Sequence, residues 1–434
     1  MDKAILLRAL RGYDRIAAPM ASRLLTGRGF LAFLCLYVLS IFLIKGVLYW
    51  GGIGHDVDQL VLAQSAQLGY DNRNPPLYTW LVIAAQSVLG VGIPAVLAVK
   101  SATILGLFGF LYLAARRIFE DERFAVLAAL GPFAMYEIGL WLPVKYSHTA
   151  ALAAVCAATF YVVLRLEQSG KTLWYVVLGC VAGVGLLIKY NYPIFLLSLL
   201  AAAAFDPGFR RRFADRRMGL VALVALGLFA PHAYWMLANA AEFQAAAVSR
   251  FGMGSDEPFF LRLAYGWASG IKAALNMLLP LALAVPYFAW RRFRQGPPGD
   301  WAERRHYRPL GRFLLIAIAA LFALVALSGA TSVRGHYLLI LVVFPLWLVA
   351  WWQGLGLSPA ALNRAALALA ILAFVSPAIM TGKFFVYPLI RDYVPYSLPF
   401  GTLADQLRDA GLREGTLYAY DYPYTLSGNL RPYL

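Results

Sequence analysis

The sequence has little charge, few cysteines and none of the short motifs that mark nucleotide- or metal-dependent enzymes. Charged residues make up only 14% of the 434 residues, and the three cysteines are Cys35, Cys156 and Cys180. All three lie inside apolar runs and have no metal-ligand spacing, so they predict neither a disulfide framework nor a zinc site. A P-loop, a dinucleotide-binding glycine motif and a zinc-protease motif are also missing. We therefore expect no cofactor and no catalytic metal.

Apolar sequence is abundant: 61% of the residues are hydrophobic, and apolar runs near 20 residues recur along the whole chain. Runs of this length match the hydrocarbon core of a bilayer, which predicts an all-α, polytopic membrane protein. The net charge of +16 lies largely in short loops between these runs. We attribute it to membrane topology and to anionic membrane lipids, and we expect no nucleic-acid partner. The first run follows a basic N-terminal segment and is interpreted as a retained anchor.

The stretch 77–91 decides the topology, because it is apolar but short for a span. If it does not cross, the basic loops all fall on the side of the N-terminus, as cytoplasmic loops do. We therefore predict eleven spans with a cytoplasmic N-terminus, and an interfacial or re-entrant helix at 77–91. The predicted spans are 30–50, 94–115, 124–140, 149–166, 173–188, 192–206, 218–238, 263–289, 313–328, 336–352 and 365–381.

Two regions result from this topology. Residues 1–381 form the predicted transmembrane domain, whose first outer loop is 51–93, and residues 382–434 form a small outer α/β segment. Within that segment the pattern favours a helix at 402–412 and a strand near 415–421. The chain ends on an alternating apolar stretch, from which we expect the natural protein to continue.

Acidic residues on the predicted outer side are the first candidates for catalysis. Asp56 and Asp58 lie in the first outer loop, and Glu137 lies in the second outer segment. Two residues apart on a helix, Asp56 and Asp58 point to different faces and need not share a role. Helix capping is the alternative explanation for both acids, whereas an outer carboxylate that reaches an acceptor hydroxyl would act as a general base.

Cations at the outer ends of the apolar runs are the second feature. One lysine or arginine at such a place usually extends its charge to the interface. Several that converge would instead bind the phosphate of a lipid. The predicted phosphate-binding set is Arg73, Lys145, Lys189 and Arg334.

Aromatic and histidine side chains complete the predicted site. The sequence Asn74-Pro75-Pro76 predicts a rigid turn into the interfacial helix, because two prolines cannot lie inside a helix. His55 has no second histidine at ligand spacing, so we interpret it as a polar neighbour of the acids. The predicted substrate-binding residues are His55, Tyr78, His148, His336 and Tyr337.

These residues together resemble the GT-C superfamily of polytopic glycosyltransferases. The chain is most similar to the branch with the bacterial lipid A aminoarabinose transferases and the relatives of protein O-mannosyltransferases. Four places carry the resemblance: Asp56 with the LVLAQSAQLGYDNRNPPLYTWL pattern, AARRIF at 114–119, GVGLLIKYNYPIFLLSLL at 183–200, and RGHYLL at 334–339 after Ser328. They are specific for the superfamily and do not identify a substrate.

The resemblance implies a polyprenyl-phosphate sugar donor, used on the periplasmic side of a bacterial inner membrane with inversion at the anomeric carbon. It implies that Asp56 deprotonates the acceptor, that Arg73, Lys189 and Arg334 hold the leaving phosphate, and that Tyr337 positions the donor. The implied acceptor is a lipid or glycan of the envelope, with lipopolysaccharide core or lipid A first.

The chain also departs from the family pattern. Val57 follows Asp56 where an Asp-Glu pair is frequent, and the stretch Lys145-Tyr146-Ser147-His148 lacks a second acid. A transporter or flippase of lipid-linked sugars is the main alternative, but it predicts matching halves with broken helices, and the sequence shows no internal repeat. A non-catalytic scaffold with the same fold is the third possibility.

Overall fold

The computed structural model describes residues 18–49, 51–52, 54–70, 74–253, 257–295, 307–356, 358–390, 398–411 and 425–434. Within these ranges the chain is almost entirely helical and forms no β-strand, apart from one isolated bridge between Met135 and Pro280. The predicted all-α architecture is thus confirmed.

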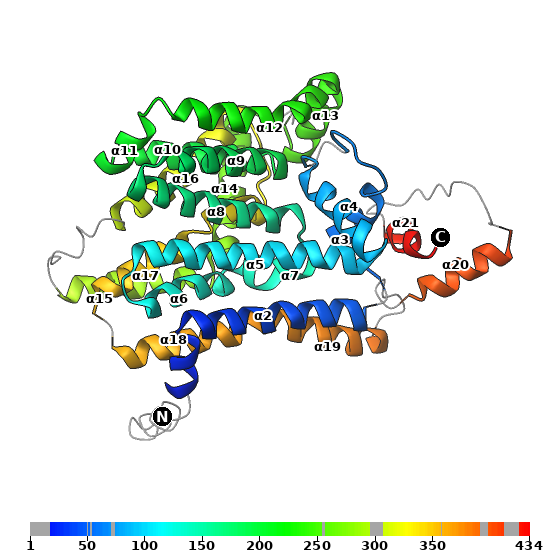
Figure 1. Cartoon of the computed structure of the whole chain (residues 1–434), viewed down its shortest axis with the longest axis horizontal. Helices are drawn as coiled ribbons and strands as arrows, with labels where there is room; N and C mark the ends of the chain where they lie inside the picture. The colour runs from blue at the N-terminus through cyan, green and yellow to red at the C-terminus, as the bar shows by residue number, and fades with distance from the viewer. Residues whose placement is uncertain are drawn as a thin grey trace.

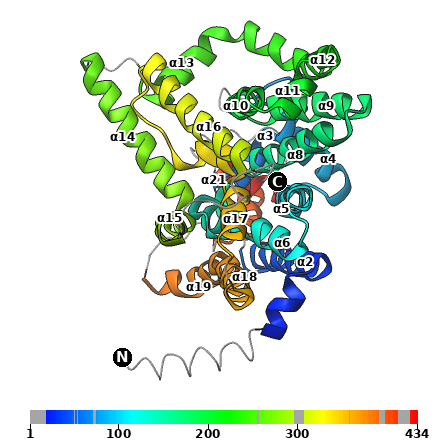
Figure 2. The ribbon, with the colours of Figure 1, turned by 90° about the vertical axis from the view of Figure 1, so that its left-hand side faces the viewer.

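Long helices run side by side along the molecule in Figure 1, and Figure 2 views them end-on. Contacts connect α5 with α2, α8 with α5, α9 with α8 and α12 with α9 in one curved layer. Helices α9 and α12 approach each other closely because a small residue lies between them. A Cβ added at Gly183 of α9 would lie only 2.8 Å from Leu228 Cδ1 of α12. The members are α2 (Gly27–Leu43), α5 (Ile93–Ile118), α8 (His148–Ser169), α9 (Thr172–Ile188) and α12 (Met218–Ala238).

The remaining apolar stretches form shorter or broken helices that pack against this layer. The stretch 122–145 changes repeatedly between helix types, and the stretch 192–213 bends by 120° between α10 and α11. The elements are α6 (Glu122–Leu130), η2 (Gly131–Ala134), η3 (Glu137–Trp141), α7 (Leu142–Lys145), α10 (Tyr192–Ala204), α11 (Pro207–Phe213), α13 (Ala240–Phe251), α14 (Phe259–Leu278), η4 (Leu281–Leu283), α15 (Ala284–Gln295), α16 (Tyr307–Ser328), η6 (Gly335–Leu341), α17 (Phe344–Gly354), α18 (Pro359–Ala373) and α19 (Val375–Ile390).

The chain is a polytopic membrane protein. By length and composition, six helices among the described residues are able to cross a bilayer, or up to eight if each bent pair is one span. The expected number of eleven stays a prediction. Part of the difference arises because apolar stretches are divided among short helices; the stretch 124–140, for example, is divided among α6, η2 and η3.

The short helix α4 (Leu77–Leu89) occupies the ambiguous stretch. The end of α2 continues as η1 (Ile44–Leu48), and Lys45 of η1 and Lys100 near the start of α5 both contact Asp56. The two long helices therefore meet at one end of the bundle, and α4 lies at that end (Figure 1). This arrangement agrees with an interfacial helix at 77–91. We call this end, which carries α3 (His55–Leu62) and α4, the site end.

The C-terminal segment also lies at the site end (Figure 1). It contains α20 (Phe400–Asp409) and α21 (Thr425–Leu430), followed by η8 (Arg431–Tyr433). Phe400, Ala404 and Leu430 form a small apolar core between α20 and α21. The helix expected at 402–412 is thus present, displaced slightly toward the N-terminus, whereas the strand expected near 415–421 falls outside the described residues.

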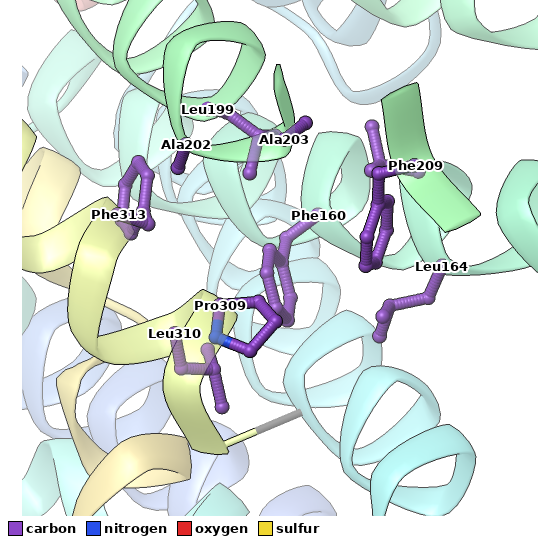
Figure 3. A pocket seen from close by; sticks show the side chains of 10 residues that line it. Phe160, Leu164, Leu199, Ala202, Ala203, Phe209, Pro309, Leu310 and Phe313 are labelled. Carbon is purple, nitrogen blue, oxygen red and sulfur yellow. The ribbon is translucent and has the colours of Figure 1, made fainter. Parts of the chain in front are cut away.

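A small apolar pocket lies between α8, α10, α11 and α16. Figure 3 shows its lining, which includes Phe160, Leu199, Phe209 and Phe313. Helix α8 begins at the site end with His148 and reaches this pocket only at Phe160 to Leu164, so the pocket is remote from the polar residues described below. Its lining carries no ionisable side chain and offers no group for transfer chemistry.

Candidate active site

Helix α3 carries both acids of the first outer loop. It begins after Gly54, which has a φ of 59°, a left-handed conformation that glycine adopts without strain. A side chain at this position would also meet Lys145, whose Cβ would lie 2.8 Å from an added Cβ. Asp56 and Asp58 fall in the first turn of α3, where negative charge is favourable, and both are buried. Helix capping alone therefore does not explain why both acids are buried, because exposed acids would cap α3 equally well.

Asp56 is enclosed by two lysines. Its carboxylate forms an ion pair with Lys45, and its Oδ1 lies 2.5 Å from Lys100 Nζ. Lys45 also donates to the carbonyl of Val144, at 2.8 Å. Although burial opposes ionisation, the positive charges of Lys100 and Lys45 hold the pKa of Asp56 below its ordinary value. The acid is thus ionised and joins η1, α3, α5 and α7.

Asp58 points to a different face of α3, as the spacing predicts. Its Oδ2 lies 3.1 Å from Nδ1 of His55, whose side chain is 47% exposed. The His55 ring stacks on Tyr146, with centroids 6.3 Å apart. His55 and Asp58 therefore form a second polar pair, and this pair faces the surface at the site end.

Glu137 is buried behind that surface. Tyr146 donates a hydrogen bond to Glu137 Oε2 at 2.6 Å, and a Cβ added at Gly335 would collide with Glu137 Oε1. Burial and the hydrogen bond to Glu137 both raise the pKa of Tyr146, so its hydroxyl stays protonated and donates. Glu137 also attracts Lys145 electrostatically. Glu137 thus sets the local geometry of η3, α7 and η6.

Three of the four predicted cations act electrostatically on one residue. Lys145, Lys189 and Arg334, together with His55, all act on His336 of η6. Lys145 and Lys189 are half-buried, and Arg334 is exposed. A common site for an anion stays a prediction for these cations.

Lys189 connects this cluster to the turn before α4. Its Nζ donates to Thr149 Oγ1 at 2.8 Å and to Asn74 Oδ1 at 3.4 Å. Arg73, which the sequence predicts as a phosphate ligand, lies outside the described residues, but its neighbour Asn74 places the chain beside Lys189. Pro76 is the residue before α4, as the turn prediction requires.

The predicted substrate-binding residues lie in the same region. Tyr78 and His148 are buried against one another with ring centroids 5.0 Å apart. The rings of His336 and Tyr337 are 4.5 Å apart, and His336 also contacts Tyr146 at 5.2 Å. Asn191, beside Lys189, donates to the Tyr337 carbonyl at 2.7 Å. Tyr78 and His148 are buried, whereas His55 lies at the surface.

Sequence reasoning missed the two lysines that enclose Asp56. Lys45 and Lys100 lie inside apolar runs, where each reads as an isolated basic residue. One indication of this arrangement was present in the sequence: charged residues inside a membrane span are usually paired with one another. Among the described residues, no group of three or more His, Cys, Asp or Glu is placed to hold a metal ion.

Comparisons with known proteins identify a family match and two sequence relatives. Residues 73–235 match the family model described as dolichyl-phosphate-mannose-protein mannosyltransferase. Two lipopolysaccharide core galacturonosyltransferases of Rhizobium johnstonii are similar in sequence: RgtB is 26% identical over 87% of this chain and 75% of its own length. RgtA is 28% identical over 70% of this chain and 60% of its own length, so the chain spans about three-fifths of that relative.

A solved structure has the same fold. The chain superposes on ArnT from Cupriavidus metallidurans bound to undecaprenyl phosphate with a TM-score of 0.66 and 15% identity, covering 94% of this chain and 85% of ArnT. Together the matches confirm the resemblance to GT-C glycosyltransferases. The sequence relatives support a glycosyltransferase, and the chain has the fold of ArnT.

Proposed function

We propose that the protein is an inverting glycosyltransferase that moves a sugar from a polyprenyl-phosphate donor to a hydroxyl of lipopolysaccharide core or lipid A. The reaction would take place at the periplasmic face of a bacterial inner membrane. The observation that carries the proposal is the convergence of Lys145, Lys189 and Arg334 next to the acid-bearing helix α3. The relatives named for lipopolysaccharide core transfer, and the undecaprenyl phosphate bound to the similar ArnT, support it.

The cations have a direct role in this reaction. As the bond between the anomeric carbon and the phosphate oxygen breaks, negative charge grows on the leaving phosphate. Lys145, Lys189 and Arg334, with Arg73 next to Asn74, would stabilise that charge. Lys189 is already oriented by Thr149 and Asn74, so it would lose little freedom when the donor binds.

The donor sugar is proposed to be a uronic acid. Both relatives are named as galacturonosyltransferases, and a uronate adds a second negative charge to the phosphodiester of the donor. The four proposed cations exceed what one phosphodiester charge requires. A cationic sugar such as aminoarabinose would instead be repelled by the same residues.

The base is proposed to be Asp56. The acceptor hydroxyl would lose its proton to this carboxylate while its oxygen forms the new bond to the anomeric carbon, and the polyprenyl phosphate leaves from the opposite face. Lys45 and Lys100 keep Asp56 ionised, as a base must be. Since Asp56 is fully buried, the acceptor would have to take the place of one lysine. Asp58, paired with His55, and Glu137 are the next candidates.

The test uses membranes that carry the wild type, Asp56→Asn or Asp58→Asn. The donors are polyprenyl phosphates linked to galacturonic acid, galactose or aminoarabinose, and the acceptors are lipid A and core lipopolysaccharide followed by mass spectrometry. Asp121→Asn is the matched control, because Asp121 pairs with Arg123 on the exposed turn before α6. We expect transfer of galacturonic acid by the wild type and the control, and none by Asp56→Asn.

Each other result has a defined meaning. Equal transfer by Asp56→Asn and the wild type would move the base to Asp58 or Glu137. Preference for aminoarabinose would refute the acidic donor. No transfer from any donor by folded protein would refute the enzyme and favour a transporter of lipid-linked sugars.

A further inference from the structure

We infer that the C-terminal helix α21 and η8 clamp α3 in place, and that Asn429 and Arg431 are positioning residues for the transfer reaction. The inference rests on the proposed function only in assigning the catalytic acids to α3. The contacts of the clamp are present in the structure whichever acid is the base.

Helix α3 needs support from outside itself. It has eight residues, and a helix of this length is marginal in isolation. It follows three glycines, Gly51, Gly52 and Gly54, which restrict the backbone little. Its last carbonyl groups have no partner within the helix. A carboxylate that must reach a reacting atom tolerates little displacement, since about 1 Å can cost about 100-fold in rate.

The entrance to α3 is held by Asn429. The Gly52 backbone N–H donates to Asn429 Oδ1 at 2.6 Å, and Asn429 Nδ2 donates back to the Gly52 carbonyl at 3.5 Å. The amide thus binds both polar groups of one backbone residue, two positions before Gly54. Asn429 is buried, so water does not compete for these bonds.

The end of α3 is held by Arg431. Its guanidinium donates to the Leu60 carbonyl, and its Nη2 donates to the Ala63 carbonyl at 3.0 Å and to Gln86 Oε1 of α4 at 3.4 Å. These carbonyls are among those that a helix leaves unpaired at its C-terminus, where a positive charge is also favourable. One side chain therefore caps α3 and connects it to α4.

The middle of α3 packs directly on the clamp. A Cβ added at Gly428 would lie 2.5 Å from Val57 Cγ1, so only glycine lets α21 approach this closely. Val57 is the residue between Asp56 and Asp58. Contacts at Gly52, Val57, Leu60 and Ala63 thus extend from just before α3 to its C-cap.

The matched control is Arg312. Its Nη1 donates at 3.1 Å to the carbonyl of Phe205, the residue that ends α10. Arg312 therefore also binds a carbonyl at a helix end, but it lies at the end of the bundle opposite the site. Arg312→Ala should lose a similar contact without moving α3.

The first experiment measures galacturonic acid transfer from its polyprenyl-phosphate donor to core lipopolysaccharide with purified, folded protein. We expect Arg431→Ala to lower kcat by about 10- to 100-fold while KM for the donor changes less than about 3-fold. Added guanidinium should restore part of the kcat of Arg431→Ala, because it can bind the carbonyls that the variant leaves without their donor. Asn429→Leu should lower kcat in the same way, and Arg312→Ala should leave it unchanged within about 2-fold.

The second experiment does not need activity. Hydrogen exchange of the peptide that covers 55–66 should be faster in Arg431→Ala than in the wild type and unchanged in Arg312→Ala. Unchanged exchange in Arg431→Ala, or a kcat equal to that of the wild type, would overturn the clamp. If the wild type transferred no sugar at all, the proposed function would fail, and the exchange experiment would still decide on the clamp.

Discussion

The cluster of Asp56, Lys45 and Lys100 leads to a prediction about stability as well as activity. Asp56→Asn removes one carboxylate and leaves two buried ammonium groups without their anion, because the side chains of Lys45 and Lys100 are 3% and 1% exposed. Removing one partner of a buried ion pair costs about 3–5 kcal/mol. We therefore expect Asp56→Asn to be strongly destabilised, and its loss of activity alone would not identify the base.

A double variant separates the two effects. Asp56→Asn together with Lys100→Met removes one charge of each sign, so the cluster keeps its net charge, and Lys45 retains the Val144 carbonyl. We expect the single variant Asp56→Asn to unfold about 5–10 °C below the wild type, and the double variant to regain a large part of that difference.

The assay is thermal unfolding in one detergent, followed by transfer measured per folded molecule. If Asp56 is the base, transfer stays absent in the double variant although its stability has recovered. If unfolding of Asp56→Asn coincided with that of the wild type, the reasoning about this buried cluster would be refuted.

The pH dependence of this stability has a definite sign. Because the pKa of Asp56 is lowered in the folded protein, against the effect of burial, its contribution is present above the ordinary carboxyl range and is lost as the pH falls through the folded pKa. The difference in unfolding temperature between wild type and Asp56→Asn should thus shrink as the pH is lowered through the acidic range. A difference that stays constant as the pH falls would assign the stabilisation to another group.

Three further predictions concern the cation cluster. Burial lowers the pKa of Lys145 against the attraction of Glu137, and Arg334 lowers it further. Lys145 should therefore lose its charge at a lower alkaline pH than an ordinary lysine does, and KM for the donor should rise from that pH. In Lys145→Arg, the same rise in KM should begin at a higher pH. Gly335→Ala should displace Glu137 and lower kcat at least about 10-fold, and wild-type kinetics would contradict the contact. Tyr146→Phe leaves Glu137 without its donor and should cost about 1–3 kcal/mol, measured by thermal unfolding against Tyr136→Phe as the control.

The helical membrane architecture could be predicted because hydrophobicity and charge along the chain are local properties. Apolar runs separated by basic loops, together with the short run at 77–91, were sufficient to expect a helical membrane protein with α3 and α4 at one end. The breaks within 124–140 and 263–289 could not be predicted, since they depend on how these segments pack against neighbouring helices. The candidate site residues could also be selected from the sequence, because acidic and basic residues are scarce in it.

Which of these residues act on one another was decided by the tertiary structure. Asp58 and His55 lie three residues apart, and their pairing follows from helix geometry. Lys45, Asp56 and Lys100 come from three different segments, and they meet only because the end of α2 and the start of α5 lie at the same end of the bundle. Arg431 is separated from Leu60 by most of the chain, and nothing local indicates that it caps α3. Sequence thus determined the elements and their chemistry, whereas long-range packing decided which charges neutralise one another and what holds α3.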